Sequence, residues 1–182
     1  MKALPAVRAA FVGFGEVNTP RELIERKCAA ARAALRELGI DPLWTEPVSD
    51  DTQGRDIARA KAELAGMQFD VLIVCLAGWI PSHAVVETIG AYTHKPLVLW
   101  GLTGEYIEGR LVTTADQAGT TALRDTLDGL GFRFKYAYDT PDQPNRGALK
   151  VKAFCEAARA AALLRGARVG MMGYRDMKLY AT

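Results

Sequence analysis

The chain has 182 residues, of which 49% are hydrophobic and 24% are charged, and its formal net charge is +2 at pH 7. This composition is typical of one globular domain with its own hydrophobic core and excludes a largely disordered chain. The near balance of charges gives no general attraction to nucleic acid or to an anionic membrane surface. The longest apolar stretch, Val71 to Ile80, is far shorter than the roughly 20 residues that a membrane-spanning helix needs.

The N-terminus and the cysteines predict a cytoplasmic location. No long apolar run precedes Arg8, so the N-terminus does not resemble a signal peptide. Cys28, Cys75 and Cys155 are odd in number and widely spaced, so they form neither a disulfide framework nor a C-x-x-C pair. Each lies in an apolar stretch, and we expect three small buried thiols in a reducing compartment. With two histidines in the chain, a zinc site built from Cys and His is not expected.

Apolar stretches bounded by turn residues predict five strands. The first and third are continuously apolar, which is typical of parallel strands that are buried on both faces. The second is more polar and contains prolines, which favours an edge position. In chain order the expected strands span Arg8 to Phe14, Pro42 to Val48, Phe69 to Ala77, Pro96 to Trp100 and Phe132 to Tyr138.

Helices are expected between these strands. For the first, we predict Thr19 as the N-cap, Pro20 at the first helical position, Glu22 completing a capping box and Gly39 ending the helix. Apolar residues at intervals of three and four place one stripe against the sheet: Ile24, Cys28, Ala31, Leu35 and Leu38. The later helices are expected over Asp56 to Ala65, from a Ser82 cap to Tyr92, over Asp116 to Leu130 and over Leu149 to Leu164.

Alternating strands and helices predict crossover connections and a parallel sheet. The expected fold is α/β, a doubly wound, flavodoxin-like parallel sheet of about five strands with helices on both faces. After the last helix, Arg168 to Gly173 looks like a further strand that enters a glycine turn. We therefore expect residues 1–166 to form one α/β domain and residues 167–182 to begin a second α/β domain or a C-terminal extension.

Ligands of open α/β sheets bind beyond the carboxyl ends of the strands. This rule selects three loops, Gly13 to Thr19, Ala77 to Ser82 and Gly101 to Arg110. The first loop contains part of a dinucleotide fingerprint, but Asn18 stands in place of the third glycine, and we do not expect a nucleotide there. The third combines glycines with Trp100 and is compatible with close approach of a ligand or another subunit.

Two side chains in these regions are candidates for binding. Arg21, one turn into the first helix, either reaches an anionic or polyol ligand or is a solvated charge on the helix face. Trp79, just after a buried strand, is a lid over a sugar, a contact to a partner or a residue packed within its own loop. Ser82 and His83 are adjacent, and their side chains point in different directions, so no nucleophile and base pair is expected. The sequence shows no P-loop, no catalytic triad and no carboxylate–histidine cluster for a divalent metal.

The segment from Asp70 to Gly104, DVLIVCLAGWIPSHAVVETIGAYTHKPLVLWGLTG, resembles the N-terminal domain of the L-fucose isomerase and L-arabinose isomerase group. The shared pattern is an apolar strand, a tryptophan turn, a helix and a strand that begins with Lys-Pro and ends with an aromatic residue and glycine. The C-terminal stretch RVGMMGYRDMKLYAT resembles the first strand and turn of that group's second domain.

The resemblance implies a much longer enzyme that interconverts aldoses and ketoses with a divalent metal, typically manganese, held by later domains. It implies no cofactor in this chain, and it implies a homo-oligomer in which Trp79 contacts the sugar site of a neighbouring subunit. Arg21 is the nearest candidate for an arginine with the same role. On this hypothesis the chain contributes substrate and subunit contacts but is inactive alone. The alternatives are a stand-alone flavodoxin-like binding module and, least favoured, an oxidoreductase that uses a dinucleotide or flavin.

Overall fold

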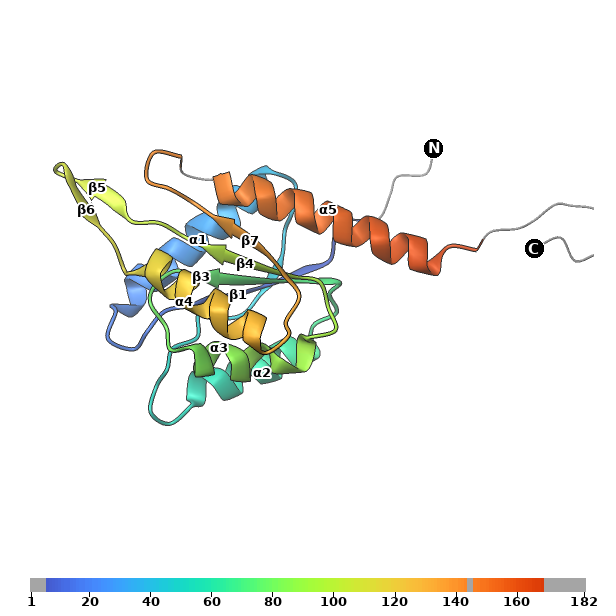
Figure 1. Cartoon of the computed structure of the whole chain (residues 1–182), viewed down its shortest axis with the longest axis horizontal. Coiled ribbons are helices and arrows are strands. Elements are labelled where there is room, and N and C mark those ends of the chain that lie inside the picture. Colours follow the sequence, from blue (N-terminus) through green and yellow to red (C-terminus); the bar gives the residue numbers. More distant parts are fainter. Residues whose placement is uncertain (1–5, 144–145, 169–182) are drawn as a thin grey trace, which may run out of the picture.

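The computed structural model describes residues 6–143 and 146–168, which form a five-stranded parallel sheet with helices on both faces (Figure 1). The strands of this sheet are β1 (Ala9–Phe14), β2 (Leu43–Trp44), β3 (Val71–Leu76), β4 (Leu97–Gly101) and β7 (Phe134–Tyr138). Their order across the sheet is β2-β1-β3-β4-β7, and every neighbouring pair is parallel. The prediction of a doubly wound, flavodoxin-like α/β fold is confirmed.

Helices cover both faces of the sheet. They are α1 (Arg21–Glu37), α2 (Arg55–Gly66), α3 (Ser82–Ile89), α4 (Asp116–Gly129) and α5 (Arg146–Gly166), with a short 3₁₀ turn at Gly90–Tyr92. Figure 1 shows α1 and α5 on one face and α2, α3 and α4 on the other. Alternate residues of β1 enter different cores, Phe11 toward α1 and α5 and Val12 toward α2 to α4. This double burial explains the continuous apolarity of β1 and β3.

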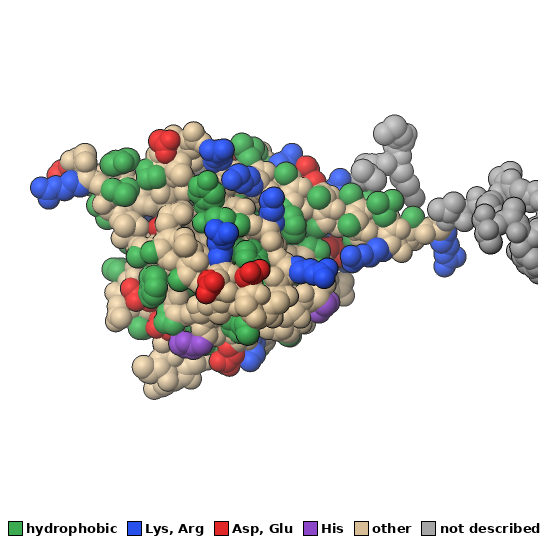
Figure 2. Space-filling model, viewed as in Figure 1, with side chains coloured by type: hydrophobic (Ala, Val, Ile, Leu, Met, Phe, Trp, Pro, Cys, Tyr) green, Lys and Arg blue, Asp and Glu red, His purple; other side chains and the backbone are tan. Residues whose placement is uncertain are grey.

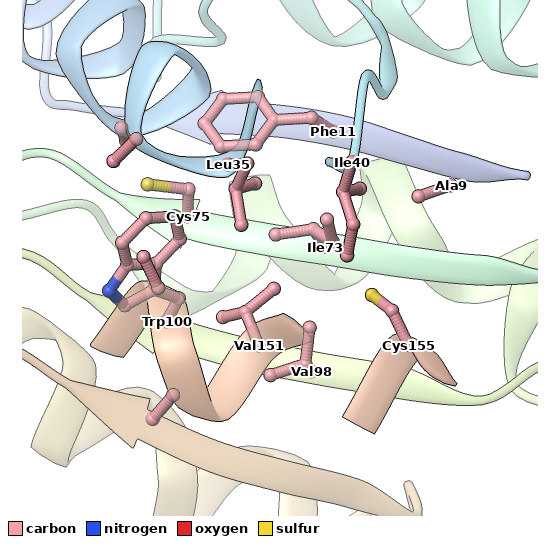
Figure 3. Close-up of a cluster of buried hydrophobic side chains, with 14 of the residues drawn as sticks. Ala9, Phe11, Leu35, Ile40, Ile73, Cys75, Val98, Trp100, Val151 and Cys155 are labelled. Atoms are coloured by element: carbon pink, nitrogen blue, oxygen red, sulfur yellow. The ribbon is translucent and has the colours of Figure 1, made fainter. Parts of the chain in front are cut away.

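Trp100 is the largest fully buried side chain, and it lies in the core that α1 and α5 cover (Figure 3). Its indole Nε1 donates a hydrogen bond to the carboxylate of Asp139, at 3.2 Å. The other oxygen of Asp139 accepts the backbone N–H of Gly147, at 2.7 Å, and so links β4 to the first turn of α5. Burial raises the pKa of Asp139, although these two hydrogen bonds favour its ionised form.

The three cysteines are buried and unpaired, as predicted. Burial raises the pKa of the Cys155 thiol to about 12. Burial also raises the pKa of Cys75, and a contact with Cys28 adds to that effect. The thiols of Cys75 and Cys155 are therefore protonated at neutral pH, and all three cysteines pack as small apolar core residues.

The predicted capping box of α1 is wrong, although the apolar stripe of that helix is confirmed. Pro20 occupies the cap position, no side chain caps the helix, and the N–H of Leu23 donates to the Pro20 carbonyl. Thr19 instead closes a tight turn, in which its N–H donates to the carbonyl of Glu16. The end of the helix is as predicted, because Gly39 adopts a φ of 84° that favours glycine.

The predicted Ser82 cap of α3 is also wrong. Pro81 occupies the cap position, and Ser82 is the first residue of the helix. The hydroxyl oxygen of Ser82 accepts a hydrogen bond from Thr126 of α4, at 3.2 Å, and so joins two helices rather than capping one. In α1 and α3 alike, the proline precedes the helical turn instead of opening it.

Three other segments differ from their predicted extent. Strand β2 is an edge strand, as expected, but it has two residues, and Val48 makes only an isolated bridge to Phe14. Helix α5 begins at Arg146, and its residues 160–166 are all exposed where it extends past the sheet (Figure 1). The predicted strand from Arg168 to Gly173 lies outside the described residues after its first position, so the boundary predicted at residue 167 stays a prediction.

Gly101 ends β4 where the strand lies against α4. A Cβ atom added there would lie 2.6 Å from Oγ1 and 3.0 Å from Cβ of the buried Thr120. We expect Gly101→Ala to lower the free energy of unfolding by about 1–3 kcal/mol in urea denaturation, because a β-branched side chain has little freedom to move aside. The double variant with Thr120→Ala should recover part of this loss.

The matched control is Gly129→Ala in α4, because a Cβ atom at Gly129 meets no atom within 4 Å. This change should leave stability unchanged or raise it slightly, by less than about 1 kcal/mol. Equal effects at Gly101 and Gly129 would contradict the close contact between β4 and α4.

Candidate functional site

The carboxyl edge of the sheet has its topological switch point between β1 and β3, where successive connections leave in opposite directions. The loops that follow these two strands are joined there. The N–H of Glu16 donates to the carbonyl of Trp79, at 2.6 Å, and the N–H of Trp79 donates to the carbonyl of Thr114, at 2.8 Å. The structure therefore brings the first two predicted loops together and adds the segment that leads into α4.

Two glycines and an isoleucine fill the space at the switch point. A Cβ atom on Gly78 would lie 3.5 Å from Cα of Gly15 and 3.0 Å from Cδ1 of Ile24. Glycine is therefore needed at position 78 for packing of the two loops, and Gly15 similarly makes room for Ile24. The space directly between the two loops is filled by Ile24, whereas a cavity remains beside the loop after β1.

The loop after β1 uses its amide groups within the protein. The N–H of Gly15 donates to the Val48 carbonyl at 3.1 Å, and the N–H of Val17 donates to the Asp50 carboxylate at 2.8 Å. The amides of Glu16 and Thr19 are bonded as described above. A phosphate-binding loop presents free N–H groups to its ligand. This arrangement therefore disfavours nucleotide binding at this loop, in agreement with the substitution of Asn18 for a glycine.

Trp79 is held at this edge by its backbone while its side chain remains 38% exposed. Its Cα also contacts α4, since a Cβ atom on Gly119 would lie 3.1 Å away. The backbone of Trp79 is thus fixed at the switch point by two loops and α4, and the residue is partly exposed there. Contact of this surface with a sugar or a partner subunit stays a prediction.

Arg21 lines a cavity of about 300 Å³ beside the same loop. Its guanidinium donates to Glu25 at 2.9 Å and to Asp56 at 2.8 Å, and so ties α1 to α2. Burial alone would raise the pKa of Asp56, but hydrogen bonds from Ser49 and Arg59 and the charge of Arg21 keep it below its ordinary value. Arg21 is thus part of an ion-pair network, and its contact with substrate stays a prediction.

A buried ion pair, which the sequence did not reveal, lies beside the segment that leads into α4. Nζ of Lys27 in α1 donates to the carboxylate of Asp116 and to the hydroxyl of Thr114. The Asp116 side chain is fully buried, and its other oxygen accepts a hydrogen bond from Thr113 at 3.0 Å. The Thr114 hydroxyl donates in turn to the Ala77 carbonyl, at 2.6 Å, after β3. This chain of contacts fixes α1, β3 and α4 relative to one another.

A hairpin that was not predicted, β5 (Glu105–Ile107) and β6 (Arg110–Val112), projects from the body (Figure 1). The third predicted loop, Gly101 to Arg110, covers β5 and the turn but only the first residue of β6. Its turn residues Glu108 and Gly109 both have positive φ, at 50° and 75°, as a two-residue hairpin turn requires. Hydrophobic side chains gather on this hairpin in Figure 2. Its exposed apolar residues are Tyr106, Ile107, Leu111 and Val112.

Below the hairpin lies a cavity of about 420 Å³ between α1 and the ends of β4 and β7. Its apolar lining includes Ala30, Ala31 and Leu102, and its polar groups include Lys27 and Asp139. The described residues thus offer hydrogen-bonding and apolar surfaces at the edge that doubly wound folds use for binding.

Among the described residues, no group of three or more His, Cys, Asp and Glu side chains is placed to hold a metal ion. None of the described helices combines the length and apolarity needed to cross a membrane. The sequence matches no known protein family and no curated protein.

The Lys27–Asp116 pair can be tested by a double-mutant cycle. We expect Asp116→Asn to lower the free energy of unfolding by about 3 kcal/mol, because it leaves a largely buried ammonium without its carboxylate partner. Lys27→Met should also destabilise, and the double variant should recover a substantial part of the summed loss. Urea denaturation measures all three variants. Strictly additive losses would contradict a direct ion pair.

Proposed function

We propose that this chain is the N-terminal, substrate- and subunit-contacting domain of an aldose–ketose isomerase that resembles L-fucose isomerase. The observation that carries the proposal is Trp79, an exposed indole on a rigid backbone at the switch point of the sheet. The resemblance of residues 70–104 to that group implies a tryptophan after the third strand that meets a neighbouring subunit's sugar.

The chemistry of a sugar suits this edge. The C–H face of a pyranose or open-chain sugar stacks on an aromatic ring, and the indole of Trp79 supplies such a ring. Sugar hydroxyls then need polar partners, and we assign this role to Arg21 and the carboxylates around it, which lie beyond β1 at the same carboxyl edge. Manganese, on this proposal, is held by the later domains that the resemblance implies.

The projecting hairpin supports the second half of the proposal, a contact with another copy of the chain. A two-stranded sheet is marginally stable by itself, and its four exposed apolar side chains gain stability when a partner covers them. The hairpin and Trp79 lie at the same edge, because Thr114 directly follows the hairpin segment and bonds to Trp79. One approaching subunit can therefore cover both. The proposed homo-oligomer is a cytoplasmic enzyme.

The alternative is a stand-alone flavodoxin-like binding module without catalysis. The cavities beside Arg21 and below the hairpin favour a small-molecule ligand for such a module. The isomerase proposal requires further domains in the same polypeptide, and the binding-module proposal does not. The protein is therefore best tested as its own gene expresses it.

The decisive experiment adds an N-terminal affinity tag at the chromosomal gene, purifies the product and measures its intact mass and its manganese-dependent isomerisation of L-fucose and L-arabinose. We expect a longer polypeptide with activity. Trp79→Ala should lower that activity at least about tenfold and shift Tm little, because the side chain is partly exposed.

Two outcomes would count against the proposal. A product with the mass of 182 residues and no turnover favours the binding module. A strong fall in Tm for Trp79→Ala, of the size seen when a core aromatic is deleted, would instead identify Trp79 as a packing residue.

The hairpin contact predicts a change in oligomeric state. Leu111→Glu should shift the assembly toward monomers in size-exclusion chromatography with light scattering, because a charge placed in an apolar interface is costly. Leu130→Glu is the matched control, since Leu130 is similarly exposed, 57% against 50%, but follows α4 at its opposite end. Equal behaviour of the two variants would exclude the hairpin from the interface.

A further inference from the structure

A separate groove of about 380 Å³ runs between α1 and the edge strand β2. One side is a stripe of α1 that includes Glu22, Glu25, Ala29 and Arg32. The other side is formed by Trp44 to Pro47, and Phe11 and Cys28 contribute apolar atoms. Trp79 does not line this groove, although Glu25 and Glu46 belong both to the groove and to the ion-pair network of Arg21. The inference drawn from it does not depend on the proposed isomerase function.

Of the four arginines of α1, Arg32 is the one without an ion-pair partner among the described residues. Arg21, Arg26 and Arg36 each lie within ion-pair distance of a carboxylate, with closest distances of 2.8, 3.2 and 2.6 Å. Arg32 instead lies with its guanidinium 3.7 Å from the ring centre of Trp44. Its Nε atom is buried, and no described residue accepts a hydrogen bond from it. A buried donor without an acceptor calls for a partner that the described residues do not supply.

The stack on Trp44 fixes the plane of the Arg32 guanidinium and removes much of its water. Burial lowers the pKa of Arg32, although an arginine remains protonated at neutral pH. A planar, charged and partly dehydrated guanidinium in a groove is the arrangement that binds a carboxylate through paired N–H groups. Arg32 therefore supplies the positive end of the groove.

The other end of the groove is acidic. Glu22, Glu25 and Glu46 line it, and Arg21 is shared among Glu25, Glu46 and Asp56. Arg26 also lines the groove, but it is paired with Glu105 of the hairpin. Glu25 and Glu46 thus share Arg21 as their ion-pair partner, Glu46 also acts on Arg32 through its charge, and Glu22 has no ion-pair partner among the described residues; the surplus negative charge favours a cation.

We propose that this groove binds a small zwitterion, with the ligand's carboxylate on Arg32 and its ammonium among Glu22, Glu25 and Glu46. Glu25 and Arg32 are seven positions apart on one helix, about 10 Å at a rise of 1.5 Å per residue. The two charges of the ligand must therefore be well separated, as in an ω-amino acid or a short peptide with free ends. A ligand with only negative charge would meet the acidic end, and one with only positive charge would leave Arg32 unpaired.

The test is calorimetric titration of the 182-residue chain with four probes: 6-aminohexanoate, triglycine, hexanoate and hexylammonium. At least one zwitterion should bind about tenfold or more tightly than either singly charged probe, because it engages both ends at once. Tighter binding of triglycine would identify a peptide as the source, and tighter binding of 6-aminohexanoate an ω-amino acid. Equal binding of hexanoate and both zwitterions, or no binding of any probe, would overturn the proposal.

Two variants locate the binding. Arg32→Gln should abolish binding of the zwitterions, whereas the control Arg36→Gln, on an exposed arginine of the same helix, should not change it. Glu22 and Glu46 are exposed, so the double variant Glu22→Gln/Glu46→Gln should fold normally even where Arg32→Gln does not. It should reduce binding of the zwitterions to the level of hexanoate. Unchanged zwitterion binding in this double variant would overturn the assignment of the acidic end.

Discussion

Lys27 and Asp116 form the interaction around which the carboxyl edge is organised. The pair joins α1 to the first residue of α4, and through Thr114 it reaches the backbone that follows β3. Helices α1 and α4 begin at this edge of the sheet and β3 ends there, so a shift of one element would displace the others. Dehydrated charges tolerate little misalignment, because an ammonium that leaves its carboxylate stays largely buried without a partner. The position of Trp79, which bonds to Thr114, follows from this constraint.

The edge acts through side chains rather than through its backbone. Many doubly wound proteins hold a ligand with loop amides, but here the amides of Gly15, Glu16, Val17 and Thr19 donate to protein oxygens. Ile24 fills the space beside Gly15 and Gly78. What remains accessible is an indole, a network of paired charges and a hydrophobic hairpin. The proposed sugar and subunit contacts rest on these groups.

The fold could be predicted from the sequence because strands that are buried on both faces have continuous apolar stretches. Continuous apolar residues placed β1, β3 and β4, and the stripe from Ile24 to Leu38 placed α1 against them. Local chemistry was less decisive. Thr19 and Pro20 are compatible with a cap followed by a helix, but the turn at Glu16 used the Thr19 amide and moved the start by one residue. Glu108 has no preference for the positive φ that the hairpin turn requires, so the sequence does not predict this turn.

The candidate sites were harder to read because they depend on distant pairs. Trp79 and Arg21 were selected by their positions after a strand and in a helix. By contrast, Lys27 and Asp116 are 89 positions apart, and the residues around each of them do not indicate that the two side chains pair. The same holds for Arg32, which stacks on Trp44 and has no carboxylate within ion-pair distance among the described residues, although the charge of Glu46 acts on it. Such features arise from packing and become visible only in three dimensions.

The hairpin also forms a wall of the cavity beneath it, through Glu105 and Tyr106 of β5. In the described part of the chain, the hairpin pairs with no strand other than its own. Its hydrogen bonds can therefore break without disturbing the five-stranded sheet, at a free energy far below that of global unfolding. A subunit packed on the hairpin would cover its exposed apolar side chains and so make this local opening rarer.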